Sequence, residues 1–376
     1  MKTKILSLCA MCVCALALNA QSLLVATLTH DETTTAYYGP KALIEACQNA
    51  NHGDIINLSA GSFVGGTITK AVSIRGAGMK ASSMTTIAGS ISFEIPLNET
   101  TETVKLEGLY MPIGYSIYVK GYFDNTFICK CSLSKLSIKT NSNMENLYVV
   151  NSIFQGNGSY NYLDFRFNNA TETTNCCIDV SDFTSPISAT FVNCFMQVPT
   201  GCIKSNQTAH CINCIVGCYY DNGTVDNNNN SSIYTSFDNC ILFNPLSGYT
   251  GYVPGVVTRN SILIDGLTWN KSSNSYIYNK GQNCLENMTY EQVFKTFEGR
   301  YSFDEDYTLT DSIATAFLGS DGTQVGIYGG SAPFSKELSY PQITKMDVAD
   351  KATDGTLRID IEISSPIQPE ENENNE

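Results

Sequence analysis

The phrase Asn193-Cys194-Phe195-Met196 returns along the chain as an Asn, a small residue and two apolar residues. Close copies begin at Asn213 and Asn239, and two more, at Asn151 and Asn260, carry Ser in place of Cys. A strand-like phrase that recurs about every 20 residues is typical of a solenoid, in which each coil stacks on the previous one. We therefore predict an all-β solenoid of parallel strands.

Each Asn of the phrase is expected to mark a corner of the coil. Asn tolerates a positive φ better than most residues, so an Asn just before a strand indicates a tight turn. Amides stacked at one corner are expected to hydrogen-bond along the stack. Beyond the corner, side chains alternate between two faces, which puts Cys194 with Met196 and Cys214 with Val216. We assign that face to the interior.

The opposite face of the same strands is also apolar. It carries Ile153, Phe195, Ile215, Ile241 and Ile262. Two interpretations are open. Either loops from the other corners cover this stripe, or the stripe is an exposed ridge that docks a partner, since large exposed apolar patches mark interfaces.

Composition and charge restrict the class of protein. Only 15% of the residues are charged, and the chain is rich in Asn, Thr, Ser and Gly, which favours strands and turns over helices. The net charge is −14, which argues against nucleic acid as a partner and against general attraction to polyanions.

Residues 1–20 are expected to form a signal peptide. Lys2 and Lys4 precede an apolar run from Ile5 to Leu18, and Ala20 provides a small residue before Gln21. That run is too short to span a bilayer comfortably, and no later segment is apolar enough to do so. We expect an exported protein without a transmembrane segment, located in the periplasm, at the cell surface or outside the cell.

Five of the 15 Cys residues occupy the repeat position at which Ser also occurs: Cys176, Cys194, Cys214, Cys240 and Cys284. This exchange with Ser indicates small buried side chains, although export would also permit disulfides between adjacent coils. The pattern His210-Cys211-x-x-Cys214 suggests zinc. Because the repeat already explains Cys214, we favour buried thiols or a disulfide, and we predict no metal.

The stretch from residue 40 to residue 78 resembles the start of the pectate-lyase-like right-handed parallel β-helix superfamily. The resemblance rests on an apolar helical pattern from Pro40 to Asn51, followed by Gly53-Asp54-Ile55-Ile56-Asn57-Leu58, Ala60-Gly61-Ser62-Phe63 and Val72-Ser73-Ile74-Arg75-Gly76-Ala77-Gly78. It implies one right-handed parallel β-helix over residues 21–335 with an N-terminal capping helix.

Residues 336–376 are then a C-terminal extension. Alternating apolar residues from Pro341 to Ile363 predict a hairpin around Asp354-Gly355, which we expect to cap the C-terminal end of the solenoid. The acidic residues 370–376 are expected to form a disordered tail.

The resemblance also implies where chemistry would lie. Enzymes of this superfamily mostly cleave acidic polysaccharides, the lyases with Asp-bound calcium and a basic residue, the hydrolases with clustered Asp residues near a Gly-His-Gly. Here none of the three histidines, His30, His52 and His210, lies in such a triplet, and no Asp-Asp pair occurs. We therefore predict no catalytic residues.

A ligand site is nevertheless predicted around Leu163-Asp164-Phe165-Arg166-Phe167. Alternation puts Asp164 and Arg166 on one face, and Lys204 and Tyr220 on following coils would add a cation and a ring suited to a sugar. The other interpretation is an ordinary surface ion pair. Asp304-Glu305-Asp306 is a candidate calcium site, although it lacks the alternating oxygen spacing of a dedicated loop; no other cofactor is expected.

We thus expect an exported protein that binds or scaffolds glycans, or a cell-surface partner, without strong catalysis. The alternative is a polysaccharide lyase or glycosidase with a non-standard site on the solenoid surface. A third interpretation is a structural surface protein without a small ligand.

Overall fold

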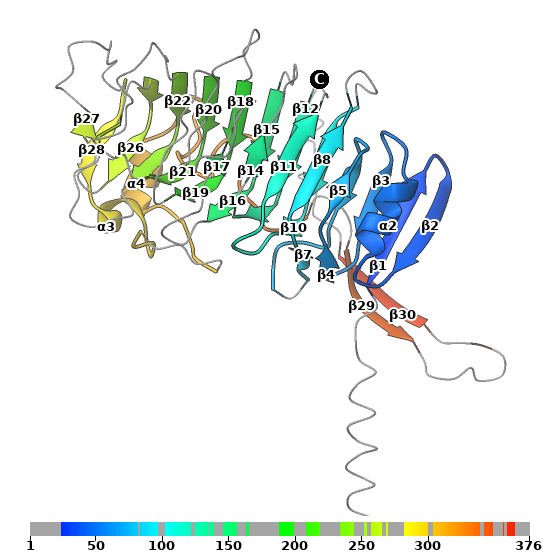
Figure 1. Ribbon diagram of the computed structural model, residues 1–376. Helices are drawn as coiled ribbons and strands as arrows, with labels where there is room; N and C mark the ends of the chain where they lie inside the picture. The colour runs from blue at the N-terminus through cyan, green and yellow to red at the C-terminus, as the bar shows by residue number, and fades with distance from the viewer. Residues whose placement is uncertain are drawn as a thin grey trace, which may run out of the picture.

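The computed structural model describes residues 24–81, 83–96, 102–121, 125–134, 136–138, 146–155, 163–164, 188–198, 208–218, 234–243, 252–253, 257–264, 268–269, 282–299, 304–338, 342–348, 356 and 359–364. These residues form a parallel β-solenoid with little helix, which confirms the predicted class of fold (Figure 1). The signal peptide predicted at residues 1–20 and the acidic tail lie outside them.

Three sheets, which we name A, B and C, form the sides of the solenoid. Sheet A has the spatial order β2 (Thr33–Tyr38), β1 (Val25–His30), β3 (Ile55–Leu58), β6 (Ser73–Arg75), β9 (Val104–Glu107), β12 (Asn125–Cys129), β15 (Asn146–Val150), β18 (Ser188–Val192), β20 (Thr208–Ile212), β22 (Tyr234–Asp238) and β25 (Val257–Arg259). Sheet B contains β4 (Gly61–Val64), β7 (Thr85–Ala88), β10 (Leu109–Tyr110), β13 (Ser132–Leu133), β16 (Ile153–Gln155), β19 (Phe195–Val198), β21 (Ile215–Cys218), β23 (Ile241–Phe243), β26 (Ile262–Ile264) and β28 (Leu285–Met288).

Sheet C contains β5 (Thr67–Ile68), β8 (Ile91–Ile95), β11 (Ile117–Gly121), β14 (Leu136–Ile138) and β17 (Leu163–Asp164). From β3 to β17 the chain visits A, B and C in turn, and each strand pairs in parallel with the equivalent strand of the next coil. Two short strands, β24 (Tyr252–Val253) and β27 (Thr268–Trp269), pair with each other.

The corner residues between sheets A and B have the positive φ that the sequence predicts. Gly108, Lys130, Asn151, Asn193, Asn213, Asn239, Asn260 and Asn283 all have φ between 46° and 67°. The backbone N–H of each corner residue from Asn151 to Asn239 donates to the carbonyl that ends the sheet A strand of the next coil, as from Asn193 to Ile212 at 3.0 Å. The Asn column predicted from the repeat is therefore confirmed.

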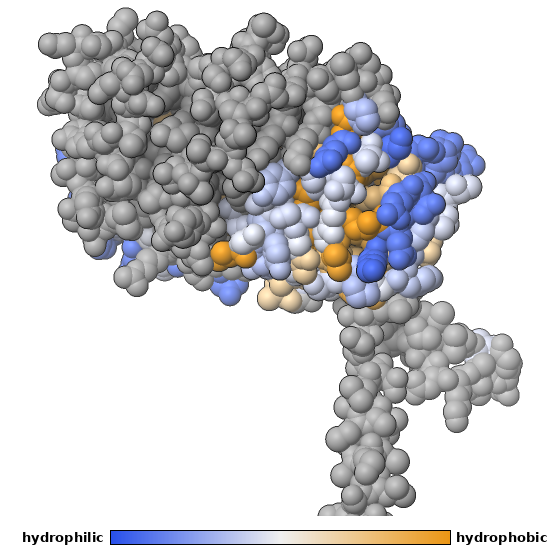
Figure 2. Space-filling view, viewed as in Figure 1, coloured by the Kyte–Doolittle hydropathy of each residue, from blue (hydrophilic) through white to orange (hydrophobic). Residues whose placement is uncertain are grey.

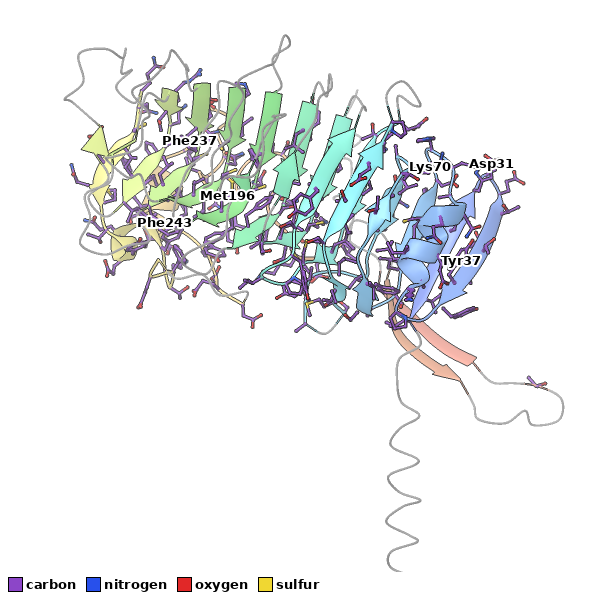
Figure 3. The ribbon with its side chains drawn as sticks, in the orientation of Figure 1. Asp31, Tyr37, Lys70, Met196, Phe237 and Phe243 are labelled. Carbon is purple, nitrogen blue, oxygen red and sulfur yellow. The ribbon has the colours of Figure 1, made fainter. Side chains whose placement is uncertain are left out.

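The two faces of sheet B are also as predicted. Phe154, Cys194, Met196, Cys214 and Val216 belong to one buried cluster inside the coil. Ile153, Phe195, Ile215, Ile241 and Ile262 belong to a second buried cluster on the other side. Figure 3 shows Met196 and Phe237 within the coil and Phe243 at the second cluster.

The second cluster is covered by a segment that we name the C-terminal strap, residues 289–299 and 304–338. It includes α3 (Tyr290–Val293) and α4 (Asp311–Ala316) and buries Phe294, Phe297, Tyr307, Ile313, Val325 and Ile327 against sheet B. The Tyr307 ring lies 4.8 Å, centroid to centroid, from the Phe195 ring. The interpretation of this stripe as an exposed ridge is therefore wrong. The stripe is covered, as the other interpretation expected, but the covering residues belong to the strap and not to loops from the corners of the coil.

The strap uses the Asn column as its hydrogen-bonding track. Asn193 Nδ2 donates to the carbonyls of Ile327 and Gly329 at 2.8 and 2.7 Å. Asn239 Oδ1 accepts from the backbone N–H of Ser320 at 2.9 Å. The predicted amide-to-amide bond is found from Asn283 to Asn260, at 2.7 Å, but Asn193 and Asn239 turn their side chains outward to the strap.

The strap runs back along the solenoid toward its first coils. Leu338 lies against Gly108, and Glu337 pairs with Lys80. Four residues later begins β29 (Gln342–Val348), which pairs antiparallel with β30 (Ile359–Ser364). The predicted hairpin is thus present, but it starts near the N-terminal coils, so its expected place at the C-terminal end is wrong.

The N-terminal end of sheet A is an antiparallel hairpin. β1 pairs antiparallel with both β2 and β3, so β2 is the edge strand. The predicted helix is present as α2 (Ala42–Asn49), and its Ala42, Leu43, Ala46 and Cys47 are buried in the interior cluster. His30, at the end of β1, bonds through Nδ1 to Asp54 Oδ1 at 2.7 Å, which ties the hairpin to the first coil.

Asn193→Gly tests the hold of the Asn column on the strap. Gly keeps the positive φ but leaves the carbonyls of Ile327 and Gly329 without their buried donors, so we expect a loss of about 1–3 kcal/mol in the free energy of unfolding. Asn260→Gly is the matched control, because the Asn260 side chain accepts from Asn283 within the column itself. Urea unfolding measures both. Equal losses would contradict this role of Asn193.

His30→Gln tests the link between hairpin and coil. The bond to Asp54, and then the charges of Asp54 and Asp31, raise the pKa of His30 above its ordinary 6.5. A raised folded-state pKa contributes stability that is complete below the unfolded value and is lost as the pH rises through the folded value. Between about pH 6 and pH 8.5, the melting temperature of the wild type should fall relative to that of His30→Gln. If the melting temperatures of the two proteins changed with pH in parallel, the link between the hairpin and the first coil would be contradicted.

Candidate ligand-binding surface

Sheet A presents a straight row of outward-facing side chains, which we name the outer row. Its members occupy equivalent positions on six adjacent strands, β9 to β22: Lys105, Phe127, Tyr148, Thr190, His210 and Ser236. The next residue on each strand points inward, as Val149 and Phe191 do, and both are fully buried. At about 4.8 Å per strand, the row extends about 24 Å.

The outer row changes in chemistry along its length. Its first half has a cation, Lys105, followed by two rings, Phe127 and Tyr148, and the Tyr148 side chain is 41% exposed. Its second half has hydroxyl and imidazole groups, on the partly exposed Thr190 and His210 and on Ser236, which is buried. An aromatic face beside hydrogen-bonding groups is the combination that holds a sugar ring.

His210 and Ser236 form a polar pair across neighbouring strands. His210 Nδ1 lies 2.8 Å from Ser236 Oγ, and the tautomer decides which of them donates. A Ser beside a His is also the first half of a nucleophilic arrangement, which needs a third group to orient the imidazole. The nearby carboxylate of Asp238 instead accepts from Arg259 Nε at 3.2 Å. Among the described residues, the pair is thus a hydrogen bond between neighbouring strands, in which Ser236 is buried.

A second row of sheet A runs beside the first, two residues further along each strand. It is charged at its ends, where it carries Arg75 and Glu107 on one side and Asp238 and Arg259 on the other. Asp238 and Arg259 neutralise each other. Between the two ends it carries Cys129, Val150, Val192 and Ile212. The middle of the outer row is thus flanked by uncharged, largely apolar groups.

The structure places only part of the sequence-predicted site. Asp164 ends β17 in sheet C, at the register position of Ser137, Tyr118 and Ser92. Its neighbour Leu163 occupies the register of the fully buried Leu136. Arg166, Lys204 and Tyr220 lie outside the described residues, so the grouping of these four residues stays a prediction.

The outer row was missed at the sequence level, although the repeat contained its signal. Tyr148, Thr190, His210 and Ser236 each lie three residues before a corner Asn. When the corner Asn residues are aligned, the position three residues before the Asn is outward, and the position two residues before it is buried, as at Val149 and Phe191.

Three cysteines of the repeat, Cys194, Cys214 and Cys240, are buried, and Cys284 is partly exposed. None of these four forms a disulfide among the described residues, and Cys176 lies outside them. Cys214 Sγ donates to the carbonyls of Ile212 and Phe191 at 3.3 and 3.4 Å, and Ser261 Oγ makes the equivalent bond to Arg259 at 2.7 Å. Thiol and hydroxyl therefore play the same part, which explains their exchange. Burial raises the pKa of the Cys47 thiol to about 12 and also raises the pKa of Cys194.

The structure describes residues of both candidate metal patterns. His210 bonds outward to Ser236, whereas Cys211 is fully buried inside the coil, so the two cannot share an ion. Asp306 Oδ1 accepts from the backbone N–H and the hydroxyl of Thr308, which uses the carboxylate within its own turn. No group of three or more potential metal ligands occurs in the part of the chain that the structure covers.

Comparison with known proteins adds no family. No protein-family model, curated protein or solved structure matches the chain. Among the described residues, no helix is long and apolar enough to cross a membrane.

Cys214→Ser should change the free energy of unfolding by less than about 1 kcal/mol, because Ser makes the same carbonyl bonds at this position in other coils. Cys211→Ser is the matched comparison: it is equally buried but lies in the column of Phe191 and Phe237. A hydroxyl among apolar side chains should cost about 1–3 kcal/mol. Urea unfolding of both variants checks this, and a Cys214→Ser loss as large as that of Cys211→Ser would refute the equivalence.

Proposed function

We propose that this protein is an exported, right-handed parallel β-helix of the pectate-lyase-like kind that binds an extended glycan along the outer row of sheet A. The observation that carries the proposal is the row itself, in which two rings and the partly exposed Thr190 and His210 stand at strand spacing, with the buried Ser236 bonded to His210. We further propose that α2 caps the first coil, because its apolar residues are buried in the interior cluster.

Recognition through this row would combine stacking and hydrogen bonding. Tyr148 offers a half-exposed ring against which a sugar can lie, while Thr190 and His210 offer polar atoms at the other half of the row. The net charge of −14 favours a neutral glycan over a polyanionic one. Asp164, Arg166, Lys204 and Tyr220 are retained as a second proposed glycan site, on the sequence argument alone.

Tyr148→Ala is the direct test. On a glycan array and in titration with the glycan that binds best, we expect about tenfold weaker binding, the loss of one ring stacking interaction. Tyr115→Ala is the matched control, because the Tyr115 side chain is 39% exposed but lies away from the outer row, in the turn after β10. Equal binding by Tyr148→Ala and the wild type would reject the row as the site.

The alternative is a polysaccharide lyase or glycosidase with a non-standard site. An absorbance assay for unsaturated uronide products on polygalacturonate distinguishes it from binding alone. We expect no product. If product forms and Arg166→Ala abolishes it, the alternative replaces the proposal. If neither product nor glycan binding is found, the third interpretation, a structural surface protein without a small ligand, replaces the proposal.

A further inference from the structure

We propose that two copies of this chain pair through their β2 strands, so that sheet A continues from one solenoid into the other. In the described structure β2 is the edge strand of sheet A, with β1 as its one partner (Figure 1). An edge strand exposes unpaired N–H and C=O groups that another strand can use. This inference concerns the N-terminal end of the molecule and is independent of the proposed glycan site.

β2 lacks the features by which proteins protect a sheet edge. Its sequence, Thr-Thr-Thr-Ala-Tyr-Tyr, contains no charged residue and no Pro, and its pairing with β1 is regular over all six residues. Five of the six side chains are exposed. Protected edges are usually charged, interrupted by Pro, or bulged.

The hydrogen-bonding parity of β2 fixes which groups are free to pair. The Gly39 N–H donates to the Leu24 carbonyl at 2.9 Å, so these two residues form a bonded pair. Bonded and non-bonded pairs alternate along antiparallel strands. The backbone groups of Thr35 and Tyr37 therefore face β1, and those of Thr34, Ala36 and Tyr38 face away from it.

A two-fold axis at Ala36 brings all three outward-facing residues into bonded pairs. Ala36 then lies opposite Ala36 of the second copy, and Thr34 lies opposite Tyr38. Shifting the register by two residues in either direction leaves one of the three unpaired. The non-bonded positions place Thr35 opposite Tyr37, and a β-branched residue against an aromatic one is a favourable cross-strand pair.

Charged residues flank β2 but lie outside its pairing. Asp31, in the β1–β2 turn, has a positive φ of 50°, and its side chain is 87% exposed. Lys41 is exposed at the N-cap of α2. Figure 3 shows Asp31 at the tip of the β1–β2 hairpin and Tyr37 along β2.

A second copy is the partner that fits these features best. An isologous pairing satisfies each free group of β2 with the same group of another β2 and closes as a dimer. The surface at this end is largely hydrophilic in Figure 2, which suits pairing by backbone hydrogen bonds more than docking of an apolar partner. The contact is short, so the dimer should be weak and should depend on concentration.

Sedimentation velocity of the mature chain, from about 1 to about 200 µM, tests the proposal. We expect a reversible monomer–dimer equilibrium. Ala36→Pro removes the N–H at the two-fold axis without touching the bonds to β1, so it should be monomeric over the same range, with an unchanged circular dichroism spectrum and melting temperature. A wild type that is monomeric throughout, or a dimer that survives Ala36→Pro, overturns the proposal.

Discussion

The left-handed backbone at the corner between sheets A and B is the constraint on which the rest of the structure depends. A positive φ at one residue turns the chain sharply enough to pass from one sheet to the next while both strands remain in register with their neighbours. Most side chains resist this conformation, and Gly and Asn accept it best. Gly108 serves at an early coil and Asn at the later ones, with Lys130 between them.

The corner restricts the type of residue that can come directly after it. That side chain points into the narrow interior beside the turn, where carbonyls of two coils come close. A small donor fits there, and both Ser152 and Cys194 donate to the carbonyl two residues before them. The choice between hydroxyl and thiol therefore matters little for hydrogen bonding, and the thiol adds apolar contact in a fully buried column. This physical equivalence explains why Cys and Ser exchange at this position of the repeat.

How far the sequence could predict the structure depends on whether a feature belonged to the repeat. The corner column, the inward Cys194 and Met196, and the apolar outer face of sheet B came from the period and from strand alternation. The C-terminal strap did not, because its contacts join residues far apart in the chain and its own sequence has no period. The lack of a period in the strap also explains why the expected hydrogen bonding between stacked Asn side chains is wrong at Asn193. The carbonyls of Ile327 and Gly329 accept from the Asn193 amide, and no sequence pattern marks these two residues. The outer row was predictable in principle, since it keeps the period of the corners.

The strap also limits where a ligand can bind. By covering sheet B with the rings of Phe297 and Tyr307, it removes the most apolar face of the coil from contact with a partner. Gly330 allows this close approach: it has a φ of 75° and leaves no room for a Cβ beside the Asn213 amide. The face that remains outward among the described sheets is polar and aromatic, above all the row that includes Tyr148 and His210 on sheet A. A surface of that kind suits a hydrated ligand held by rings and hydrogen bonds. The fold therefore uses the apolar outer face of sheet B to hold the chain's own strap and leaves the mixed face of sheet A uncovered by that strap.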